Sequence, residues 1–439
     1  MFSALNCIFR ILMVHYIPLL MGIGIPSFRE FLQAPFQLLL FQWLLILGVS
    51  RLFGLFFQRM HQPAVIGEII AGIFLGVSGL GALFPRFFEL VFPASSFGGL
   101  EIISKTGLCI FMFILGMELD FAQLRSRLRT VSIISSTTIL IPFLCGLVLA
   151  VFILPGFRLP HTQPEAFAVF CGVAMSITAF PVLARIVQAR HLNHTPLGQL
   201  AMSCAAFADV IAWCLLALVI AYIRAGSLWS GFSTLLLSGF YLLLMFFAVK
   251  PWFNKLVIRF REAHYNQYHL LVLSFMILII SALLAEWIGI HLLFGSFIAG
   301  MMIPGKEKLH RALADRLEDV SVHLFLPVFF AFNGLRLQLH LLDSVSLWLQ
   351  TLSIIVIAVA SKGISAAWPA YRSGISRGDS IRMGILMNTR GLMEIVVLNI
   401  GYELGILSPT LFAMFLIMAL VCTLMTNPMM DLCDRLIRR

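Results

Sequence analysis

The chain has 439 residues, of which 60% are hydrophobic and 11% are charged, and its mean hydropathy is +0.99. A soluble domain is excluded, because such a chain lacks the polar residues needed to cover a water-facing surface. The formal net charge of +10 does not indicate a nucleic-acid partner, since basic residues gather in the cytoplasmic loops of membrane proteins.

Apolar runs of about 20 residues recur along the whole chain, as membrane-spanning helices require. The strands of a membrane barrel would be shorter and would alternate in polarity. We therefore predict an all-α polytopic protein of the lipid bilayer, with about 13 spans near 36–57, 63–83, 101–120, 130–155, 164–188, 197–223, 228–250, 267–287, 290–305, 320–336, 346–369, 380–402 and 408–430.

The basic residues of the loops alternate along the chain. Loops after odd-numbered spans are rich in Arg and Lys, for example Arg125, Arg127 and Arg129 after the third span, whereas loops after even-numbered spans carry few. Because positively charged loops stay on the cytoplasmic side, the pattern predicts a cytoplasmic C-terminus and an external start of the first span. A miscounted span would have reversed the alternation beyond it.

Residues 1–35 precede the first predicted span. This segment is apolar but contains Arg10 and His15, and it fits an interfacial helix, a signal-like leader or an extra span. We favour an external or interfacial segment that is not essential. Residues 36–439 form one transmembrane domain without a P-loop or room for a nucleotide-binding domain, so ion gradients are the expected energy source.

The eight cysteines are scattered and form no CxxC pair. Neither a disulfide framework nor a zinc site is indicated, and we expect no cofactor, no structural metal and no enzymatic activity.

Two predicted spans are interrupted. In 164–188, Pro181 cannot donate a backbone hydrogen bond, so carbonyl groups near Ser176 to Thr178 would be free to help coordinate a cation. In 380–402, Gly391 and its polar neighbours weaken the helix. The two spans stand seven apart in the order and therefore run in opposite directions. Such a pair is typical of inverted-repeat secondary transporters, although two ordinary kinked helices would give the same pattern.

Asp209 lies near the middle of the predicted span 197–223. A charge at the bilayer centre costs ~3 kcal/mol or more, which makes this carboxylate a candidate functional residue. Burial favours its protonated form and a nearby cation favours its ionised form, so it can hold a proton at one time and a cation at another. The alternative is a buried Asp that a proton neutralises or a hydroxyl caps.

Several further charged residues lie inside predicted spans. Lys362 either pairs with Asp209 or another carboxylate, fills a cation's place when the site is empty, or snorkels to the cytoplasmic interface. Arg390 and Glu394 are four residues apart and share a helix face, and we favour a structural pair over direct ion binding. For Glu68 the sequence leaves both the bundle interior and an interface open.

Several longer motifs resemble one family, the second branch of the monovalent cation:proton antiporters. This branch includes Kef-type potassium efflux systems, bacterial sodium/proton antiporters and plant cation/proton exchangers, and the similarity covers about 60–430. The matching stretches are GEIIAGIFLGVSGLG (67–81), KTGLCIFMFILGMELD (105–120), SITAFPVLARI (176–186), AAFADVIAW (205–213), LFGSFIAGMMIP (293–304), LPVFFAFNGLRLQL (326–339) and MNTRGLMEIVVLNIGYELGILSP (387–409).

The resemblance implies a homodimer with a sodium/proton antiporter-like fold of 13 spans, built from two inverted repeats with crossed, discontinuous helices. It implies a core domain, which we place at about 130–223 and 346–430. This core would move like an elevator against dimerisation and scaffold helices at about 36–83 and 228–305.

The resemblance also implies roles for single residues. By position, Ser176 and Thr178 lie at the first break and Asn388 to Arg390 at the second. Asp209 matches the family's central carboxylate, which binds the proton and the transported cation. Lys362 matches the basic residue of the eleventh span.

Ala208 departs from the family pattern. Many electrogenic members have a second Asp at this position, and electroneutral members often have Asn. Ala208 can neither ionise nor coordinate a cation, so one titratable group remains and electroneutral exchange is favoured. The change also removes the usual partner of Lys362. Gating by a C-terminal nucleotide-binding domain, as in Kef-type systems, is not expected.

The sequence thus predicts a secondary-active antiporter that exchanges Na⁺ or K⁺ for H⁺ at Asp209, in a cell membrane and most simply a bacterial inner membrane. Two alternatives stay open. One is a channel-like potassium efflux pathway. The other is a family member repurposed for another solute or as a scaffold. The departure of Ala208 from the family pattern leaves this alternative open.

Overall fold

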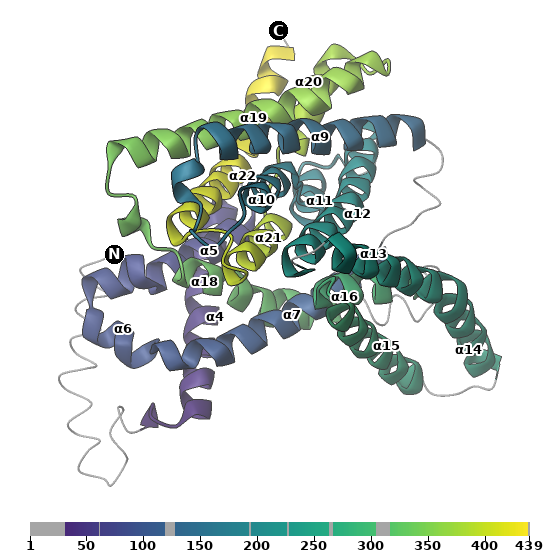
Figure 1. The fold of residues 1–439 in the computed structure, drawn as a ribbon, viewed down its shortest axis with the longest axis horizontal. Coiled ribbons are helices and arrows are strands. Elements are labelled where there is room, and N and C mark those ends of the chain that lie inside the picture. Colours follow the sequence, from purple (N-terminus) through teal and green to yellow (C-terminus); the bar gives the residue numbers. More distant parts are fainter. Residues whose placement is uncertain are drawn as a thin grey trace.

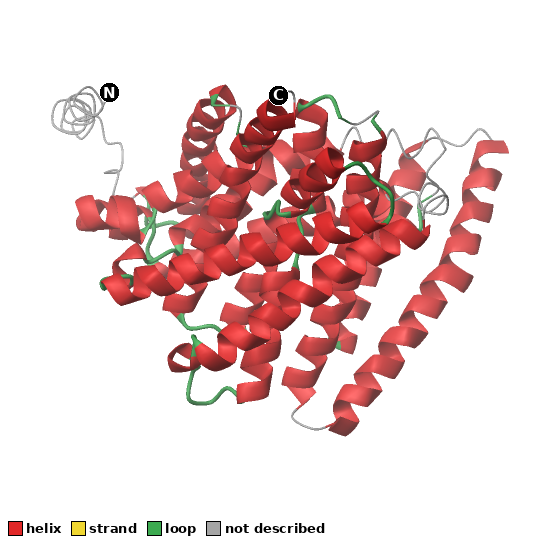
Figure 2. Cartoon of the chain, turned by 90° about the horizontal axis from the view of Figure 1, so that it is seen from above, coloured by secondary structure: helices red, strands yellow, loops and turns green. Residues whose placement is uncertain are grey.

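The computed structural model describes residues 31–60, 62–118, 128–192, 195–225, 228–262, 267–303 and 317–437. Within these ranges the regular elements are helices, and strand-like pairing is limited to an isolated bridge between Arg158 and Leu407 (Figure 2). The all-α prediction is confirmed. Most of the N-terminal segment 1–35, namely residues 1–30, lies outside the described residues.

The first half of the described chain contains eight α-helices with one π-helical and two 3₁₀ segments. Their bounds are α4 (Pro35–Arg59), α5 (Ala64–Leu75), η2 (Val77–Gly81), α6 (Pro85–Val91), η3 (Ala94–Ser96), α7 (Phe97–Glu118), α9 (Leu128–Phe152), η4 (Pro155–Phe157), α10 (Pro164–Ser176), α11 (Phe180–Ala189) and α12 (Pro196–Ala225).

The second half contains nine α-helices with two π-helical segments and one 3₁₀ segment. Their bounds are α13 (Leu228–Leu243), η5 (Leu244–Val249), α14 (Lys250–Glu262), α15 (Gln267–Ile288), α16 (Leu292–Met301), η6 (Ser321–Phe325), α18 (Leu326–Leu335), η7 (Leu339–Leu341), α19 (Val345–Arg372), α20 (Arg377–Met387), α21 (Leu392–Glu403) and α22 (Pro409–Ile437).

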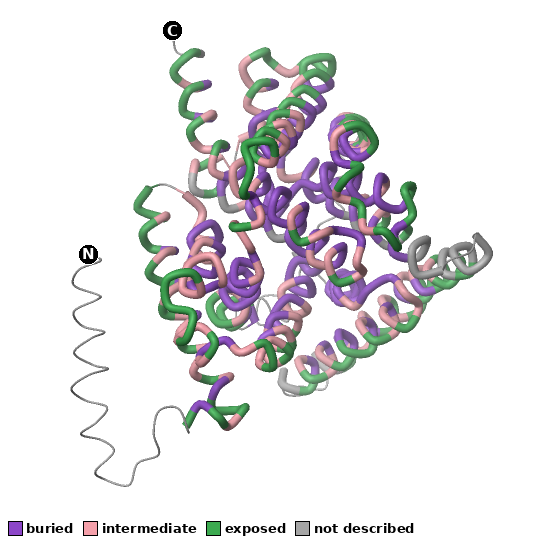
Figure 3. Tube along the Cα trace, turned by 60° about the vertical axis from the view of Figure 1, so that its left-hand side comes forward, coloured by how far each residue is buried: buried purple, intermediate pink, exposed green. Residues whose placement is uncertain are grey.

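Ten helical stretches of the described chain are long and apolar enough to cross a membrane, and α10 and α16 are shorter apolar helices. The outer surfaces carry large apolar side chains, such as Trp287, 83% exposed, and Phe247, 76% exposed. Buried residues gather in the middle of the bundle (Figure 3). Apolar residues face outward because lipid, not water, surrounds these helices. The multi-pass membrane prediction is confirmed, and the count of 13 spans stays a prediction.

The residues between the predicted spans 228–250 and 267–287 are largely helical. Residues 251–262 belong to α14, which continues directly from η5. Phe253 and Val257 are four residues apart and both are buried, so one face of this charged helix packs against the protein. Figure 1 shows α13, α14 and α15 extending to one side of the bundle.

The helices pack in two groups. In one group α9 packs against α10, α12 and α19, while α22 packs against α19, α20 and α21. In the other, α5 packs against α4 and α18, while α7 packs against α16 and α18. Figure 1 shows α9 and α19 running side by side across one end of the first group. A division into a moving core and a fixed scaffold stays a prediction.

A ring of ion pairs joins the two groups. Lys105 of α7 contacts Glu101 at 2.7 Å and Glu403 at 3.3 Å, and Arg336 contacts the same two carboxylates at 3.3 and 3.9 Å. Glu403 is the last residue of α21, so it is the member that belongs to the first group. The ring therefore fastens the end of α21 to α7 and to the end of α18.

Replacing Glu403 with Gln should remove the attraction between the groups at this point. These side chains are partly exposed, so we expect a loss of about 1 kcal/mol or less, which salt should diminish. The measurement is the apparent unfolding temperature at low and at high choline chloride. Equal unfolding temperatures of E403Q and the unaltered protein at low salt would show that the ring does not stabilise the contact.

Candidate functional site

Both predicted interruptions are present. Helix α10 ends at Ser176 and α11 begins at Phe180, while α20 ends at Met387 and α21 begins at Leu392. Pro181 stands in the first turn of α11, where a missing N–H leaves no bond unmade. The expectation of two discontinuous helices is confirmed, and the breaks fall at the predicted residues.

The two breaks cross in contact with each other. The backbone N–H of Ala179, in the first break, donates to the carbonyl oxygen of Thr389, in the second, at 3.1 Å. A Cβ atom at Gly391 would lie 2.5 Å from Cγ2 of Val182, so a residue with a side chain does not fit there without a shift. Gly391 thus permits the close approach of the two unwound segments.

Arg390 links the second break to the end of the first half-helix. Its guanidinium donates to the carbonyls of Ala174 and Met175 at 3.2 and 2.9 Å and pairs with Glu394 at 2.9 Å. Arg390 and Glu394 are both fully buried. The last carbonyls of a helix lack intrahelical donors and carry partial negative charge. The arginine therefore supplies hydrogen-bond donors to the end of α10 and a positive charge beside it. This is the geometry of a capping residue.

Thr423 of α22 holds the backbone of the second break. Its hydroxyl donates to the carbonyl oxygen of Arg390 at 2.6 Å and accepts from the N–H of Arg390 at 3.3 Å. The unwound peptide therefore finds partners inside the protein, as a lipid-surrounded chain requires.

Lys362 of α19 is fully buried and does not reach an interface. Its ammonium group donates to the carbonyl oxygen of Thr138 at 2.9 Å, to the hydroxyl of Thr178 at 2.7 Å and to the carbonyl oxygen of Ser176. The hydroxyl of Ser176 instead donates to the carbonyl of Val173. The ammonium thus occupies two of the oxygens that the first break exposes.

Asp209 lies on α12 and is 2% exposed. In the described part of the chain neither of its carboxylate oxygens has a hydrogen-bond partner, and it forms no ion pair with Lys362 within 4.0 Å. The N–H of Phe180 and the ammonium of Lys362 are near enough to act on it electrostatically. An ionised carboxylate that is buried without a partner is costly, and this singles out Asp209 as the candidate site.

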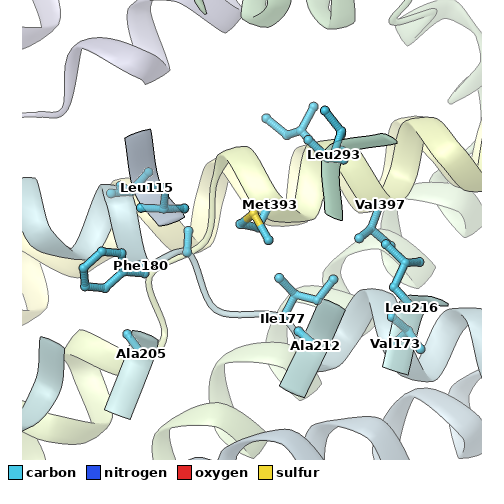
Figure 4. Packing of buried hydrophobic residues seen from close by; sticks show 14 of the residues in the cluster. Leu115, Val173, Ile177, Phe180, Ala205, Ala212, Leu216, Leu293, Met393 and Val397 are labelled. Atoms are coloured by element: carbon cyan, nitrogen blue, oxygen red, sulfur yellow. The ribbon is translucent and has the colours of Figure 1, made fainter. Parts of the chain in front are cut away.

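Small and apolar residues surround this part of α12. Ala205, Ala206, Ala208 and Ala212 are all buried. Ala205 and Ala212 belong to the same buried cluster as Ile177, which lies in the first break, and Phe180, which directly follows it (Figure 4). Asp209 is therefore a single carboxylate in an apolar layer beside the crossed segments.

At and just after the second break, two buried side-chain oxygens also have no hydrogen-bond partner among the described residues, Oδ1 of Asn388 and Oε2 of Glu394. Asn388 lies at the second break and adds an amide acceptor there. Thr138, whose carbonyl binds Lys362, is not among the residues that the sequence singled out. The available signal was Pro142 inside α9, because a proline leaves the carbonyl four residues earlier without its helical donor.

Residues 44–431 match the family described as sodium/hydrogen exchanger, transmembrane. The chain belongs to this family. It is 41% identical over 393 residues to the Na⁺/H⁺ antiporter NhaS4 of Synechocystis, with 89% of this chain and 96% of that protein covered. The prediction of the antiporter family is confirmed.

Eukaryotic relatives are longer. The chain is 34% identical to K⁺/H⁺ antiporter 1 of Saccharomyces cerevisiae, with 93% of this chain covered, and to cation/H⁺ antiporter 17 of Arabidopsis thaliana, with 91% covered. It spans about half the length of each, 48% in both cases.

The fold is also that of a solved transporter. The structure of the sodium proton antiporter MjNhaP1 from Methanocaldococcus jannaschii at pH 8 superposes with a TM-score of 0.69 at 15% identity. The match covers 91% of this chain and 98% of the archaeal one. The sodium/proton antiporter-like fold is confirmed.

Replacing Arg390 with Leu should destabilise the protein strongly, because it leaves the Glu394 carboxylate and two helix-end carbonyls buried without a donor. We expect a loss of about 3–5 kcal/mol, seen as lower yield of monodisperse protein and a lower unfolding temperature. The control is the double variant R390L/E394L, which removes both charges and should lose less. A single variant as stable as the unaltered protein would refute the capping role.

Proposed function

We propose that the chain is a secondary-active monovalent cation:proton antiporter that exchanges Na⁺ or K⁺ for H⁺ at Asp209. The observation that carries this is a buried carboxylate without a hydrogen-bond partner beside two crossed helix breaks. The names of the relatives, which include Na⁺/H⁺ and K⁺/H⁺ antiporters, support the same activity.

Competition at one carboxylate couples the two fluxes. A proton neutralises Asp209, and a cation does so only when the proton has left. Only a neutralised site crosses the apolar layer at low cost, since a bare buried charge is strongly disfavoured. An alternating rearrangement of the core, of the elevator type, then exposes the loaded site to either side in turn.

Ser176 and Thr178 complete the proposed cation site with Asp209. In the structure their oxygens are bound by the Lys362 ammonium. Lys362 therefore stands in for the cation in the empty site and leaves these oxygens when the cation enters. Asn388 contributes a nearby acceptor, while Arg390 and Glu394 hold the crossed segments in place.

Electroneutral exchange follows from the single carboxylate. Protonated Asp209 with charged Lys362 has the same net charge as ionised Asp209 with a bound monovalent cation and charged Lys362. We propose that the protein works as a homodimer in a cell membrane with its C-terminus in the cytoplasm, as the loop charges predict. Core helices would be those of about 130–223 and 346–430.

Ala208 supports one rival. It is buried next to Asp209 and has no side-chain oxygen, so the site has fewer side-chain ligands than a chain with Asp or Asn there. A member of the family repurposed for another solute would show no proton release with Na⁺, K⁺ or Li⁺.

The decisive variant is Asp209→Asn. In proteoliposomes with an acid interior and a pH-sensitive dye, pulses of Na⁺ or K⁺ should raise the internal pH with the unaltered protein. D209N should reduce this response by 100-fold or more, because the amide cannot take up and release a proton. The control D343N removes an exposed carboxylate far along the chain and should respond normally. Full activity of D209N would exclude the shared-site mechanism.

Ala208→Asp should change the charge balance. A second carboxylate can carry a second proton, so exchange should become sensitive to a clamped membrane potential, whereas the unaltered protein should be insensitive. A208N adds a similar volume without a titratable group and should stay insensitive. Dye responses with and without valinomycin and K⁺ measure this, and an electrogenic unaltered protein would contradict the single-carboxylate account.

A further inference from the structure

In the first packing group, α9 and α19 each contain a proline inside the helix, Pro142 and Pro369. A proline has no N–H, so the carbonyl four residues earlier loses its helical donor. The carbonyls concerned are those of Thr138 and Ser365. Such groups need a new donor inside a membrane protein.

Each helix supplies the donor for the other. Lys362 of α19 donates to the carbonyl of Thr138 at 2.9 Å, and the hydroxyl of Thr137 of α9 donates to the carbonyl of Ser365 at 2.9 Å. The two helices pack side by side (Figure 1). They are the fourth and eleventh predicted spans, seven apart like the two broken spans. The reciprocal hydrogen bonds between them therefore obey the symmetry of the inverted repeat.

The two exchanges differ chemically. The Thr137 hydroxyl is neutral and also lies within hydrogen-bond distance of carbonyls of its own helix, those of Ile133 and Ile134. The Lys362 ammonium is charged, fully buried and also bound to Ser176 and Thr178 at the first break. Among its three acceptors, the carbonyl of Thr138 is the one outside the broken span.

From this we infer that Pro142 is a positioning residue for transport, because it frees the Thr138 carbonyl to hold the Lys362 ammonium beside the cation site. When a cation takes the oxygens of Ser176 and Thr178, the ammonium keeps its bond to α9. This inference rests on the proposed function, and it assigns no direct contact between Pro142 and the cation.

Pro142→Ala tests it. The alanine restores an N–H that returns to the Thr138 carbonyl, which then binds the ammonium less strongly. Because the Thr138 carbonyl is the acceptor that the ammonium keeps when the cation holds the other two oxygens, the cation-bound state should be weakened most. We therefore expect the KM for the cation to rise about three- to tenfold, with little change in kcat. P369A is the matched control: it makes the same backbone change in the partner helix but affects the neutral Thr137 bond, and its KM should not change.

The effect must depend on the lysine. In the K362M background, P142A should change KM by less than about 1.5-fold, since no ammonium remains to be held. If K362M does not transport, the same cycle is measured from the shift in unfolding temperature produced by Na⁺, K⁺ or Li⁺. An unchanged KM in P142A, an equal change in P369A, or a persistent effect in the K362M background would each overturn the inference.

Failure of the proposed function gives a different result. Unaltered protein without any cation-driven proton release would refute the antiporter. In that case the unfolding temperatures alone decide the inference: P142A and K362M must be non-additive, whereas P369A and K362M must be additive. Additive effects of P142A and K362M would refute the link between Pro142 and Lys362.

Discussion

Backbone groups that lose their helical partner inside a membrane must find another partner within the protein, and most of the site follows from this constraint. The two interrupted spans expose N–H and carbonyl groups at membrane depth. The bond from Ala179 to Thr389 joins the two breaks, and Thr423 satisfies both backbone groups of Arg390. The breaks are therefore stable only as a crossed pair, which fixes where the surrounding side chains lie.

Buried charged side chains must also find partners within the protein. In the described chain the buried Asp, Glu, Lys and Arg residues are Asp209, Lys362, Arg390 and Glu394. The two basic groups each bind carbonyls at the end of α10, but only Arg390 also has a carboxylate partner. Asp209 has no ion-pair partner among the described residues. The fold thus separates a structural ion pair from a free carboxylate, and a free carboxylate is what exchange between a proton and a cation needs.

The ion-pair ring at the end of α21 and the site at its beginning lie on the same helix. Glu403 ends α21 next to α7 and α18, and Arg390 lies just before its start. A rearrangement of the first packing group relative to the second would have to break or reform the contacts of Glu403. Because these contacts are partly exposed, such a change costs less free energy than disrupting the buried pair of Arg390 and Glu394.

The features that the sequence determined by itself depend on residues close together in the chain. Spans, breaks and the membrane carboxylate depend on hydropathy, on Pro181 and Gly391, and on the isolation of Asp209 in an apolar run, all of which are visible in a window of about 20 residues. The partners of the buried groups are not local. Lys362 binds Thr138, 224 positions away, and Arg390 binds Met175, 215 positions away. The sequence left Lys362 between a carboxylate partner, the empty cation site and an interface, and only the packing of α9, α10 and α19 placed its ammonium on the freed oxygens. The reason is that a proline reveals which carbonyl loses its donor, whereas the identity of the new donor depends on which helix lies beside it.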